Sequence, residues 1–321
     1  MTLPHVVLHM DAPNEALGLV REQFPELSVS TCTDYENLPD HILETGAGIV
    51  YSVRFAGTAG FPRAALVESD TVRWVSVGGS GTDHLAGWNP NRVIVTNAAG
   101  VAADMMAEYT LGTLLYFSLD LPGFRRAQNE RCWIEGRVSP IEGRTLLIIG
   151  LGQTGRAIAR RAKAMGMRVL GMRARPTPTP HVDKVLPVSS LLEVLPTADA
   201  VAVCVPLLDS TRNLLDSKAI ARFKEGAVLV DVSRGGVVDQ KSLATALGAG
   251  HLKGAALDVF ETEPLPDNSP FWRMKNVIVS PHCSSVYEGW ELKSVAMFCD
   301  NLRRYLAGEA LGNVVDPERG Y

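Results

Sequence analysis

Three segments in the second half of the chain each place an ionisable side chain shortly after an apolar run. They carry Arg234, Glu263 and His282. Ligands of open α/β sheets bind beyond the carboxyl ends of the strands, so these side chains could meet in one crevice. There a histidine can transfer a proton near neutral pH and an arginine can bind a substrate carboxylate. Each residue alone has an ordinary alternative, because Arg–Glu pairs usually mark surface salt bridges and a histidine after proline is often structural.

A glycine-rich turn between a buried strand and a helix predicts a dinucleotide site. Residues 144–155 (RTLLIIGLGQTG) place Gly150, Gly152 and Gly155 in the spacing Gly-x-Gly-x-x-Gly, and helical composition follows over 156–165. The first glycine permits the tight turn, the second lets a pyrophosphate approach the backbone, and the third permits close helix packing. The helix N-terminus then offers free N–H groups to the anion. The alternative is a glycine-rich turn that binds nothing, which the strand–turn–helix context disfavours.

The end of the next predicted strand indicates which dinucleotide is preferred. An NAD site normally has Asp or Glu there, about 20 residues after the glycines, to hold the adenosine ribose hydroxyls. Here the strand over 168–172 runs into Arg173-Ala174-Arg175, with no acid nearby. Guanidinium groups suit a ribose 2′-phosphate, so we expect NADPH to be preferred while NADH remains usable. Arg173 is the favoured ligand and Arg175 the second; alternatively both are solvated loop cations.

The elements that must position these residues follow an alternating pattern. Short β-rich apolar runs alternate with helix-like stretches, which predicts an α/β fold with two parallel sheets. The expected strands are 6–9, 49–52, 74–77 and 93–95 in the first sheet, and 146–149, 168–172, 200–205, 227–231, 254–257 and 277–279 in the second. Helices are expected over 102–121 and 285–306. The Pro-rich stretch 176–180 is interpreted as an ordered surface loop.

A chain of 321 residues predicts two domains. If the last helix returns to the first sheet, residues 1–98 and 285–321 form a discontinuous substrate-binding domain. Residues 99–284 then form the dinucleotide-binding domain, and the active site lies in a cleft between the two.

Composition argues against several classes of function. A net charge of −4 spread over residues of both signs gives no basic face, so nucleic acid is not an expected partner. The five cysteines form no Cys-x-x-Cys pair, which favours reduced thiols in the cytoplasm, and no ligand spacing predicts a metal. The most apolar helix candidate carries Asp104, Glu108 and Asp120, and no export signal opens the chain, so no membrane association is expected.

Together these motifs resemble those of the D-isomer-specific 2-hydroxyacid dehydrogenase family, and more narrowly its glyoxylate/hydroxypyruvate reductase group. The matching segments are 79–83 (GSGTD), 97–108, 144–155, 206–211 and the three catalytic segments. The resemblance implies two Rossmann-like domains, a flavodoxin-like substrate domain and a dinucleotide-binding domain. It also implies that Arg234, Glu263 and His282 form a catalytic triad and that Asp258 lies near the nicotinamide carboxamide.

The predicted site contains the triad and two binding sets. The cofactor-binding residues are Gly150, Gly152, Gln153, Thr154, Gly155, Arg173, Arg175, Pro206, Thr211, Ser233, Asp258 and Met105. The substrate-binding residues are Arg54, Phe55, Ser80, Gly81, Arg234 and His282.

The residue types fit the reduction of a 2-oxo acid. Hydride transfer to the carbonyl carbon creates a developing alkoxide, which needs a proton and a nearby positive charge. His282 can give the proton, and Glu263, bonded to the other ring nitrogen, would fix the tautomer and favour the imidazolium. Arg234 can bind the substrate carboxylate and polarise the oxo group, a bidentate task to which lysine is poorly suited. Backbone N–H groups around Ser80 and Gly81 are expected to hold the other side of the carboxylate, although a simple strand-ending turn is the alternative.

The identity of the oxo acid stays open at this point. Relatives often have Val-Arg-Ser where this chain has Val53-Arg54-Phe55, and Phe55 adds apolar bulk near the predicted substrate mouth. Tyr51 and Trp133 could add more, with Trp133 supplied by a partner subunit, but aromatic residues here are more often packing. Glyoxylate, hydroxypyruvate and bulkier 2-oxo acids therefore all remain candidates.

Two further hypotheses concern partners. The helix expected over 102–121 has more apolar surface than one core-facing stripe requires, which favours a two-fold homodimer over the alternative of a wholly buried helix. A dinucleotide-sensing, corepressor-type protein on the same fold is the rival function. The absence of an evident peptide-binding extension and the indication of NADPH at Arg173 count against it.

Overall fold

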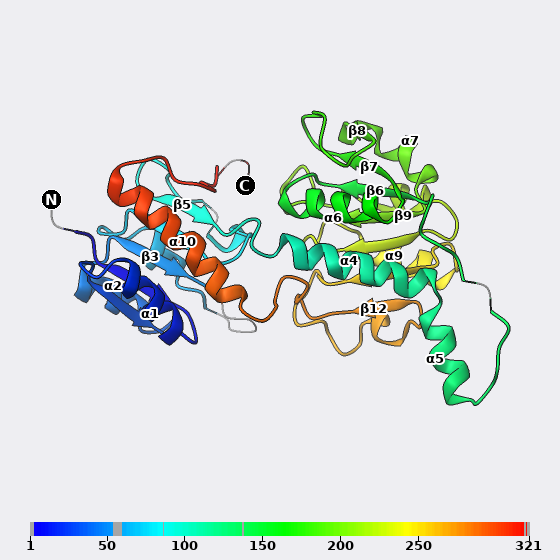
Figure 1. Ribbon diagram of the computed structural model, residues 1–321, viewed down its shortest axis with the longest axis horizontal. Coiled ribbons are helices and arrows are strands. Elements are labelled where there is room, and N and C mark those ends of the chain that lie inside the picture. The colour runs from blue at the N-terminus through cyan, green and yellow to red at the C-terminus, as the bar shows by residue number, and fades with distance from the viewer. Residues whose placement is uncertain (1–2, 54–59, 86, 137, 318, 320–321) are drawn as a thin grey trace. The chain divides into compact units, whose positions relative to one another are not determined.

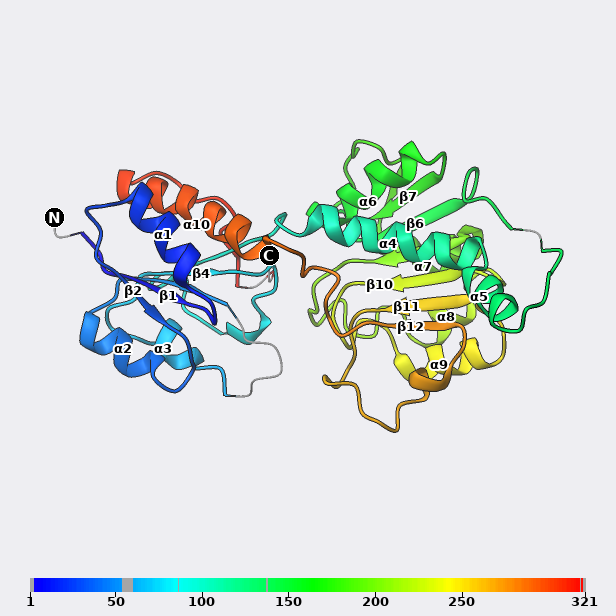
Figure 2. The same ribbon diagram turned by 60° about the horizontal axis from the view of Figure 1, so that its bottom comes forward.

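The first group of predicted strands forms one parallel sheet in the computed structural model, which describes residues 3–53, 60–85, 87–136, 138–317 and 319 (Figure 1). The strand order is β2-β1-β3-β4-β5, the flavodoxin-like order. The strands are β1 (Val6–His9), β2 (Val29–Cys32), β3 (Ile49–Ser52), β4 (Trp74–Val77) and β5 (Ile94–Asn97). Helices α1 (Asn14–Gln23) and α10 (Trp290–Ala307) cover one face, and α2 (Leu38–Thr45) and α3 (Arg63–Val67) cover the other (Figure 2).

Both faces of this sheet are buried, which explains why its inner strands β1, β3 and β4 are mostly apolar. The C-terminal helix α10 belongs to this sheet through an aromatic cluster. Trp74 of β4 is fully buried, its ring stacks on Tyr305 with the ring centroids 5.3 Å apart, and Phe298 lies against it at 5.2 Å. The Trp74 indole N–H donates to Thr96 Oγ1 at 2.9 Å. The last helix therefore returns to the first sheet, the condition on which a discontinuous first domain depends.

The second sheet has seven strands in the order β12-β11-β10-β9-β6-β7-β8, again all parallel. They are β6 (Thr145–Ile149), β7 (Arg168–Met172), β8 (Lys184–Leu186), β9 (Ala200–Val203), β10 (Val228–Asp231), β11 (Gly254–Leu257) and β12 (Val277–Val279). The strand order reverses between β6 and β9, the topological switch point at which dinucleotides bind in such sheets.

Helices cover both faces of the second sheet as well. Helices α4 (Ala103–Ser118) and α6 (Gln153–Ala164) lie on one face; α7 (Leu191–Val194), α8 (Ser217–Ala221) and α9 (Gln240–Gly248) lie on the other. Helix α5 (Leu121–Asn129) lies beyond the end of α4, away from the sheet (Figures 1 and 2). Short 3-10 helices cover Asp83–Leu85, Val188–Ser190, Leu195–Thr197 and Pro270–Arg273. No helix of the described residues is long and apolar enough to cross a membrane.

The chain divides into two units, residues 1–101 with 288–321 and residues 102–287. Each crossing lies three residues beyond the expected boundary, at 101/102 instead of 98/99 and at 287/288 instead of 284/285. The predicted α/β fold with two parallel sheets is confirmed. The binding role assigned to each unit stays a prediction.

Several local expectations were wrong. Strand β2 was missed because half of its residues are polar, and β8 because only two apolar residues follow its exposed Lys184. The helix expected over 102–121 ends at Ser118: Asp120 takes a left-handed conformation (φ 49°), and its side chain accepts a hydrogen bond from the Gly123 N–H to cap α5. Helix α6 begins three residues before the expected 156, within the glycine motif itself, and α10 begins at 290 instead of 285.

Candidate active site

The glycine turn after β6 has the shape of a pyrophosphate cradle. Gly150 has φ 103°, and a Cβ there would lie 2.7 Å from the Cys204 carbonyl oxygen of the neighbouring strand end. A Cβ at Gly155 would lie 1.9 Å from the Gly150 carbonyl oxygen, so only glycine lets α6 begin this close to the turn. A Cβ at Gly152, by contrast, would meet nothing within 4 Å, and no side chain caps the first turn of α6. The backbone therefore fits an anion at Gly152 and the N–H groups of α6.

The residues around this turn are held by their own contacts. Thr154 Oγ1 donates to Met106 Sδ at 3.5 Å, which ties the start of α6 to α4, while the predicted ligand Met105 is half-buried on the same helix. Gln153 Oε1 accepts from Arg156 Nη2 at 3.0 Å, so its side chain lies along α6. These contacts engage both side chains, so the predicted contact of Gln153 and Thr154 with a pyrophosphate would be made by their backbone N–H groups.

Pro206 and Thr211 form the ordered loop after β9, the strand next to β6. Thr211 Oγ1 donates to the Pro206 carbonyl oxygen at 2.6 Å and accepts from the Leu208 N–H at 2.8 Å. A single threonine hydroxyl thus fixes both ends of the loop. The structure shows how Thr211 shapes this loop, and its contact with a dinucleotide remains a prediction.

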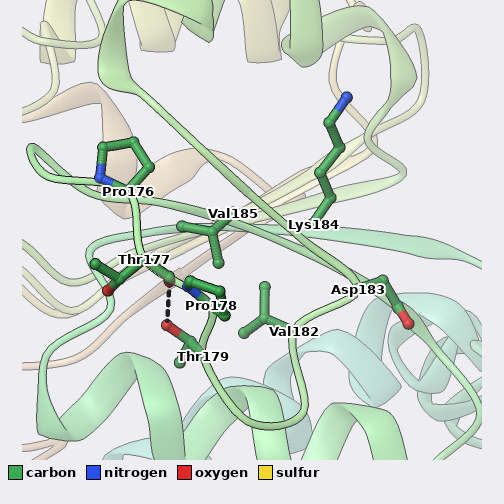
Figure 3. Close-up of a pocket in the computed structure, with 8 residues that line it drawn as sticks. All are labelled: Pro176, Thr177, Pro178, Thr179, Val182, Asp183, Lys184 and Val185. Atoms are coloured by element: carbon green, nitrogen blue, oxygen red, sulfur yellow. Dashed lines mark hydrogen bonds between the residues drawn. The ribbon is translucent and has the colours of Figure 1, made fainter.

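Arg173 follows β7 and is partly buried, whereas Arg175 is exposed. The Arg173 guanidinium donates from Nη1 to Thr177 Oγ1 at 3.1 Å. Thr177 belongs to a shallow pocket of about 280 Å³ lined by Pro176, Thr177, Pro178, Thr179, Val182, Asp183, Lys184 and Val185 (Figure 3). None of the predicted catalytic residues lines this pocket. Residues 176–180 are ordered, as expected, and the Thr177 contact holds Arg173 to this loop.

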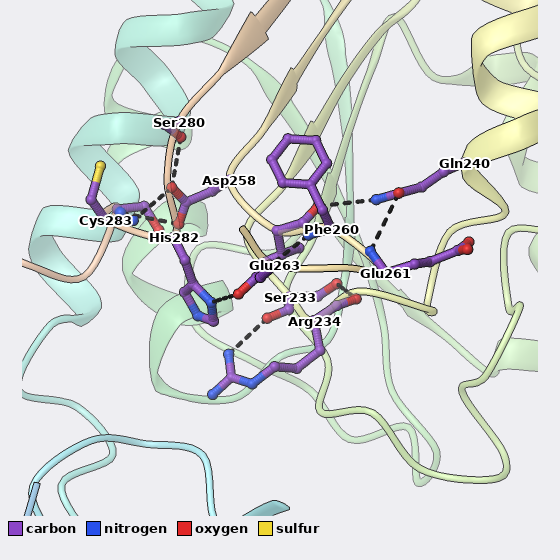
Figure 4. Close-up of polar contacts among 12 residues, drawn as sticks. Ser233, Arg234, Gln240, Asp258, Phe260, Glu261, Glu263, Ser280, His282 and Cys283 are labelled. Carbon is purple, nitrogen blue, oxygen red and sulfur yellow. Dashed lines mark hydrogen bonds and ion pairs between the residues drawn. The ribbon is translucent and has the colours of Figure 1, made fainter. Parts of the chain in front are cut away.

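The predicted triad comes from three adjacent strand ends. Arg234 follows β10, Glu263 lies in the loop after β11 and His282 follows β12, and these strands are neighbours in the sheet. Parallel strands end at the same edge, so the three side chains lie close together (Figure 4). His282 Nδ1 and Glu263 Oε2 are 2.9 Å apart, and both side chains are 37% exposed. The pair is therefore accessible to a small ligand from solvent.

Glu263 is fixed by a second contact, and its pKa is lowered. Its Oε1 accepts the Phe260 N–H at 2.9 Å, while its Oε2 pairs with His282. Burial alone raises the pKa of Glu263, but the hydrogen bonds from His282 and Phe260, with the nearby charges of His282 and Arg234, outweigh it and hold the pKa below its ordinary value. Glu263 is thus a carboxylate at neutral pH and orients the His282 ring.

His282 sits in an unusual backbone conformation that Asp258 stabilises. Its φ is 52°, in the left-handed region that few non-glycine residues adopt. The His282 N–H donates to the Asp258 carbonyl oxygen at 2.9 Å. The buried Asp258 carboxylate accepts from Ser280 Oγ at 2.6 Å, from the Cys283 N–H at 2.9 Å and from the Ser284 N–H at 3.0 Å. Asp258, predicted to lie near the nicotinamide, thus also holds the turn that carries His282.

Arg234 is held by backbone contacts on the same side of the site (Figure 4). Its Nη1 donates to the Ser233 carbonyl oxygen at 2.8 Å. A Cβ at the next residue, Gly235, would lie 1.9 Å from the Phe260 carbonyl oxygen, so the Arg234 loop packs directly on the loop that leads to Glu263. The two loops therefore fix each other, and only glycine permits their contact.

Asp231, at the end of β10, was not predicted as a site residue. It is 2% exposed, and its Oδ1 accepts the Ser233 N–H at 3.0 Å and the Ser233 hydroxyl at 2.5 Å. Burial, with a smaller contribution from Asp258, raises its pKa to about 7, although the Ser233 hydrogen bonds and Arg234 oppose the rise. The predicted cofactor ligand Ser233 therefore uses its hydroxyl on Asp231. An Asp two residues before a Ser at a strand end is an Asx-turn pattern, a signal that could have identified it.

The first unit holds the other predicted substrate residues. Arg54 and Phe55 lie outside the described residues. Ser80 is exposed and Gly81 partly exposed in the loop after β4, where the Ser80 carbonyl oxygen accepts from Asn97 Nδ2 at 2.7 Å. Tyr51 is a packing residue, the alternative that the sequence favoured: it is fully buried, and its hydroxyl donates to Ser294 Oγ at 2.9 Å.

Among the described residues, no group of three or more His, Cys, Asp or Glu side chains is arranged to hold a metal ion.

Two further hydroxyl groups near the triad were not predicted from the sequence, those of Tyr109 and Ser280. They lie 171 residues apart in the chain and meet at 2.7 Å. No local sequence pattern signals such a pair.

Comparisons with known proteins agree on one family. The family model for "D-isomer specific 2-hydroxyacid dehydrogenase, NAD binding domain" matches residues 111–284. D-3-phosphoglycerate dehydrogenase of Methanocaldococcus jannaschii is 30% identical over 97% of this chain, which spans 59% of that relative's length. Glyoxylate reductase of Korarchaeum cryptofilum is 34% identical over 70% of each protein.

A solved structure agrees over the whole length. The D-isomer specific 2-hydroxyacid dehydrogenase of Xanthobacter autotrophicus, crystallised with NADPH and MES, superimposes with a TM-score of 0.85 at 30% identity and covers 100% of both chains. The predicted family resemblance is thereby confirmed. By fold, by glycine turn and by sequence, this chain belongs to the D-isomer specific 2-hydroxyacid dehydrogenase family.

Proposed function

We propose that this protein is an NAD(P)H-dependent reductase that converts small 2-oxo acids to D-2-hydroxy acids. The observation that carries the proposal is the His282–Glu263 pair at 2.9 Å, with Arg234 beside it on the adjacent strand end. A proton donor, its orienting carboxylate and a cation for a carboxylate are the groups that reduction of a 2-oxo acid requires.

The residues divide the work as follows. Glu263 occupies His282 Nδ1, which leaves Nε2 to give its proton to the developing alkoxide. Because the pKa of Glu263 is lowered, the carboxylate is charged at neutral pH and stabilises the imidazolium before the proton is transferred. Arg234 binds the substrate carboxylate and polarises the oxo oxygen. When bound, the reduced nicotinamide supplies the hydride.

The chain's own groups would hold the dinucleotide at the switch point of the second sheet. The open space at Gly152 and the uncapped start of α6 suit the pyrophosphate. We propose that NADPH is preferred, since Arg173 stands where an NAD site has an acid, and that Arg175 is a weaker second ligand. The NADPH bound to the X. autotrophicus relative supports this choice. Arg173→Ala should lower kcat/KM for NADPH on the order of 10-fold or more and leave that for NADH nearly unchanged, whereas Arg175→Ala should change neither by much.

For the substrate we propose glyoxylate or hydroxypyruvate. The K. cryptofilum relative, a glyoxylate reductase, supports a small oxo acid. The M. jannaschii relative is a D-3-phosphoglycerate dehydrogenase, so D-3-phosphoglycerate is the competing candidate substrate. It is tested in the direction of oxidation.

A spectrophotometric assay tests the proposal. The oxidation of NADPH and of NADH is followed with glyoxylate, hydroxypyruvate, pyruvate and phenylpyruvate, using the wild type and His282→Asn. Asparagine tolerates the left-handed backbone of His282, so the variant should fold and lose activity by about 100-fold or more. His181→Asn is the matched control, because the exposed His181 has a similar φ of 65°. A preference for NADH would contradict the cofactor assignment, and tight dinucleotide binding without turnover would favour the sensing protein.

We also propose a homodimer in the cytoplasm. Helix α5 and the segment after it carry apolar side chains that nothing in the described part of this chain covers well: Leu121, Phe124, Trp133, Ile134 and Val138. Trp133 is 96% exposed, which supports a contact with a second copy. All five cysteines are free, which supports a reducing compartment.

A further inference from the structure

A chain of hydroxyl groups runs from helix α4 to the Asp258 carboxylate beneath the turn that carries His282. The Tyr109 hydroxyl lies 2.7 Å from Ser280 Oγ, and Ser280 Oγ lies 2.6 Å from Asp258 Oδ1. All three side chains belong to the second unit, and Ser280 and Asp258 are buried. We propose that Tyr109 and Ser280 are positioning residues that hold His282 in register with Glu263, a proposal that rests on the proposed function.

The direction of the chain follows from the protons available. Ser280 has one hydroxyl proton and donates it to the Asp258 carboxylate. Its oxygen can then only accept from Tyr109, so the order is Tyr109 to Ser280 to Asp258. Burial, aided by the charges of Asp258, Cys283 and Asp231 and only partly offset by the bond to Ser280, raises the pKa of Tyr109 to about 12. The phenol therefore remains a donor throughout the neutral pH range.

Asp258 connects the hydroxyl groups of Tyr109 and Ser280 to the His282 turn through three hydrogen bonds. Its carboxylate binds the N–H groups of Cys283 and Ser284, the two residues after His282, and its carbonyl oxygen binds the His282 N–H. The turn at His282 is left-handed and has little freedom to relax locally. A rotation of the carboxylate would therefore move the imidazole.

Glu263, the partner of His282, is fixed independently. Its Oε1 accepts the Phe260 N–H, a contact that the hydroxyl chain does not touch. The 2.9 Å bond between His282 and Glu263 thus depends on two separate supports. If the Tyr109 hydroxyl is lost, His282 shifts while Glu263 stays in place, and this bond lengthens. A displacement near 1 Å at a catalytic group can cost on the order of 100-fold in rate, and a smaller displacement costs less.

The ring of Tyr109 has a separate role in packing. It is half-buried and lies against the apolar core that α4 shares with α6. Tyr109→Phe keeps that packing and removes only the hydroxyl. Tyr116→Phe is the matched control, because Tyr116 is a half-buried tyrosine of the same helix whose ring packs on Phe117.

The test compares these variants with three readouts: kcat and KM for both substrates, the pH dependence of kcat/KM in the direction of reduction, and NMR of the His282 ring without ligands. For Tyr109→Phe we expect kcat to fall about 10-fold with both KM values within about twofold. The alkaline limb of the pH profile should move to lower pH, because a longer bond to Glu263 stabilises the imidazolium less. The ionisable groups near the hydroxyl groups of Tyr109 and Ser280 are Asp231, Asp258 and Cys283. The charge of Arg234 lowers the pKa of Glu263, the partner of His282.

Ser280 supplies the conservative comparison. Ser280→Ala removes the donor to Asp258 and should give a larger loss in the same direction, whereas Ser280→Thr keeps a hydroxyl and should restore most of the activity. Tyr109→Phe behaving like Tyr116→Phe, or losing activity through KM with an unchanged pH profile, would overturn the proposal. Absence of turnover in the wild type would instead refute the proposed function. The NMR titration of His282 still tests the positioning in that case, and an identical midpoint in wild type and Tyr109→Phe would overturn it.

Discussion

At the scale of single residues, Arg234 shows why the type of cation matters. Its guanidinium can bind a carboxylate with two parallel hydrogen bonds and still face the oxo group, and Nη1 already anchors on the Ser233 carbonyl. Lysine keeps the charge and loses this geometry. We expect Arg234→Lys to lower kcat/KM for the oxo acid by roughly 100- to 1000-fold in steady-state kinetics, with a higher KM from weaker carboxylate binding and a lower kcat from weaker polarisation of the oxo group.

The control for Arg234→Lys is Arg222→Lys. Arg222 is an exposed arginine at the end of α8, and its exchange should leave the kinetics unchanged. A loss of less than about threefold in Arg234→Lys would exclude bidentate binding by this residue.

Glu263 determines how the activity depends on pH. Its pKa is held below the ordinary value, so its charge is lost only as the pH falls through that lowered pKa, and the pairing with His282 is intact at neutral pH. Glu263→Gln preserves the shape and removes the charge that stabilises the imidazolium. The pH profile of kcat/KM for reduction should then move to lower pH, with activity at pH 8 falling more than activity at pH 6. Parallel profiles for variant and wild type would show that the carboxylate only orients the ring.

The pKa of Asp231 is raised, whereas that of Glu263 is lowered, and the protonation of Asp231 affects the stability of the protein. Its raised pKa of about 7 means that the folded state binds more protons than the unfolded chain between pH 4 and 7, so its contribution to stability is lost as the pH rises. Asp231→Asn removes this slope. Between pH 5 and pH 8 the variant should gain on the order of 2 kcal/mol relative to wild type, measured by urea unfolding at both pH values.

Asp239 provides a control of opposite sign for that experiment. It caps α9 through Ser242, whose hydrogen bonds lower its pKa. The stability that the Asp239 carboxylate contributes is therefore present above its ordinary pKa and lost in acid. At neutral pH, Asp239→Asn should be less stable than the wild type. The same change in the free energy of unfolding between pH 5 and pH 8 in wild type and Asp231→Asn would refute the raised pKa of the buried Asp231.

At the scale of elements, two glycines of the turn after β6 have different roles, Gly155 in folding and Gly152 in the predicted binding of the dinucleotide. A Cβ at Gly155 would lie 1.9 Å from the Gly150 carbonyl oxygen, whereas one at Gly152 would meet nothing within 4 Å. Gly155→Ala should therefore destabilise the protein by about 2 kcal/mol or more. Gly152→Ala should change stability by no more than about 1 kcal/mol and weaken NADPH binding on the order of 10-fold or more. Thermal unfolding and fluorescence titration measure the two effects, and tight NADPH binding by Gly152→Ala would place the pyrophosphate elsewhere.

Elements with a strong pattern were predictable from the sequence. Buried parallel strands are continuous apolar runs, so β1, β3, β4, β7, β11 and β12 were predicted with the bounds they have. Strand β8 has only two apolar residues, Val185 and Leu186, after its exposed Lys184, so its apolar run is too short to detect. The end of α4 was missed because Asp120, not a glycine or proline, takes the left-handed turn.

The site was predictable where topology alone brings residues together. Arg234, Glu263 and His282 each follow a strand, and neighbouring parallel strands end at one edge. Tyr109 and Asp231 were not predictable in this way. Tyr109 looks like an ordinary apolar residue of a helix, and its function depends on which side of α4 faces Ser280. The ionisation of Asp231 depends on complete burial, which only the packed structure reveals.

At the scale of the whole molecule, the path of the chain follows from one aromatic cluster. Trp74 near the middle of the first sheet stacks on Tyr305 and contacts Phe298 of α10. Burial of these aromatic rings stabilises the packing of α10 on the first sheet and opposes the entropic cost of closing the long loop between them. The first unit is therefore built from both ends of the chain, while the triad and the glycine turn belong to the second unit.

Helix α5 and the segment after it carry exposed apolar side chains, a feature that the packing of a single chain does not explain. Phe124 is 39% and Trp133 96% exposed, whereas most other aromatic side chains in the described part of the chain are buried or half-buried, with Trp272 at 53% as an exception. Exposed apolar residues grouped on one segment are typical of an interface, and two-fold dimers are the commonest assembly. Sedimentation at micromolar concentration should therefore give twice the chain mass of 34.6 kDa. The double variant Phe124→Glu with Trp133→Ser should sediment as a monomer, whereas Leu43→Glu, at a 77% exposed leucine of α2, should not. A wild-type monomer would remove the dimer, and a dimer that survives the double variant would place its interface on another surface.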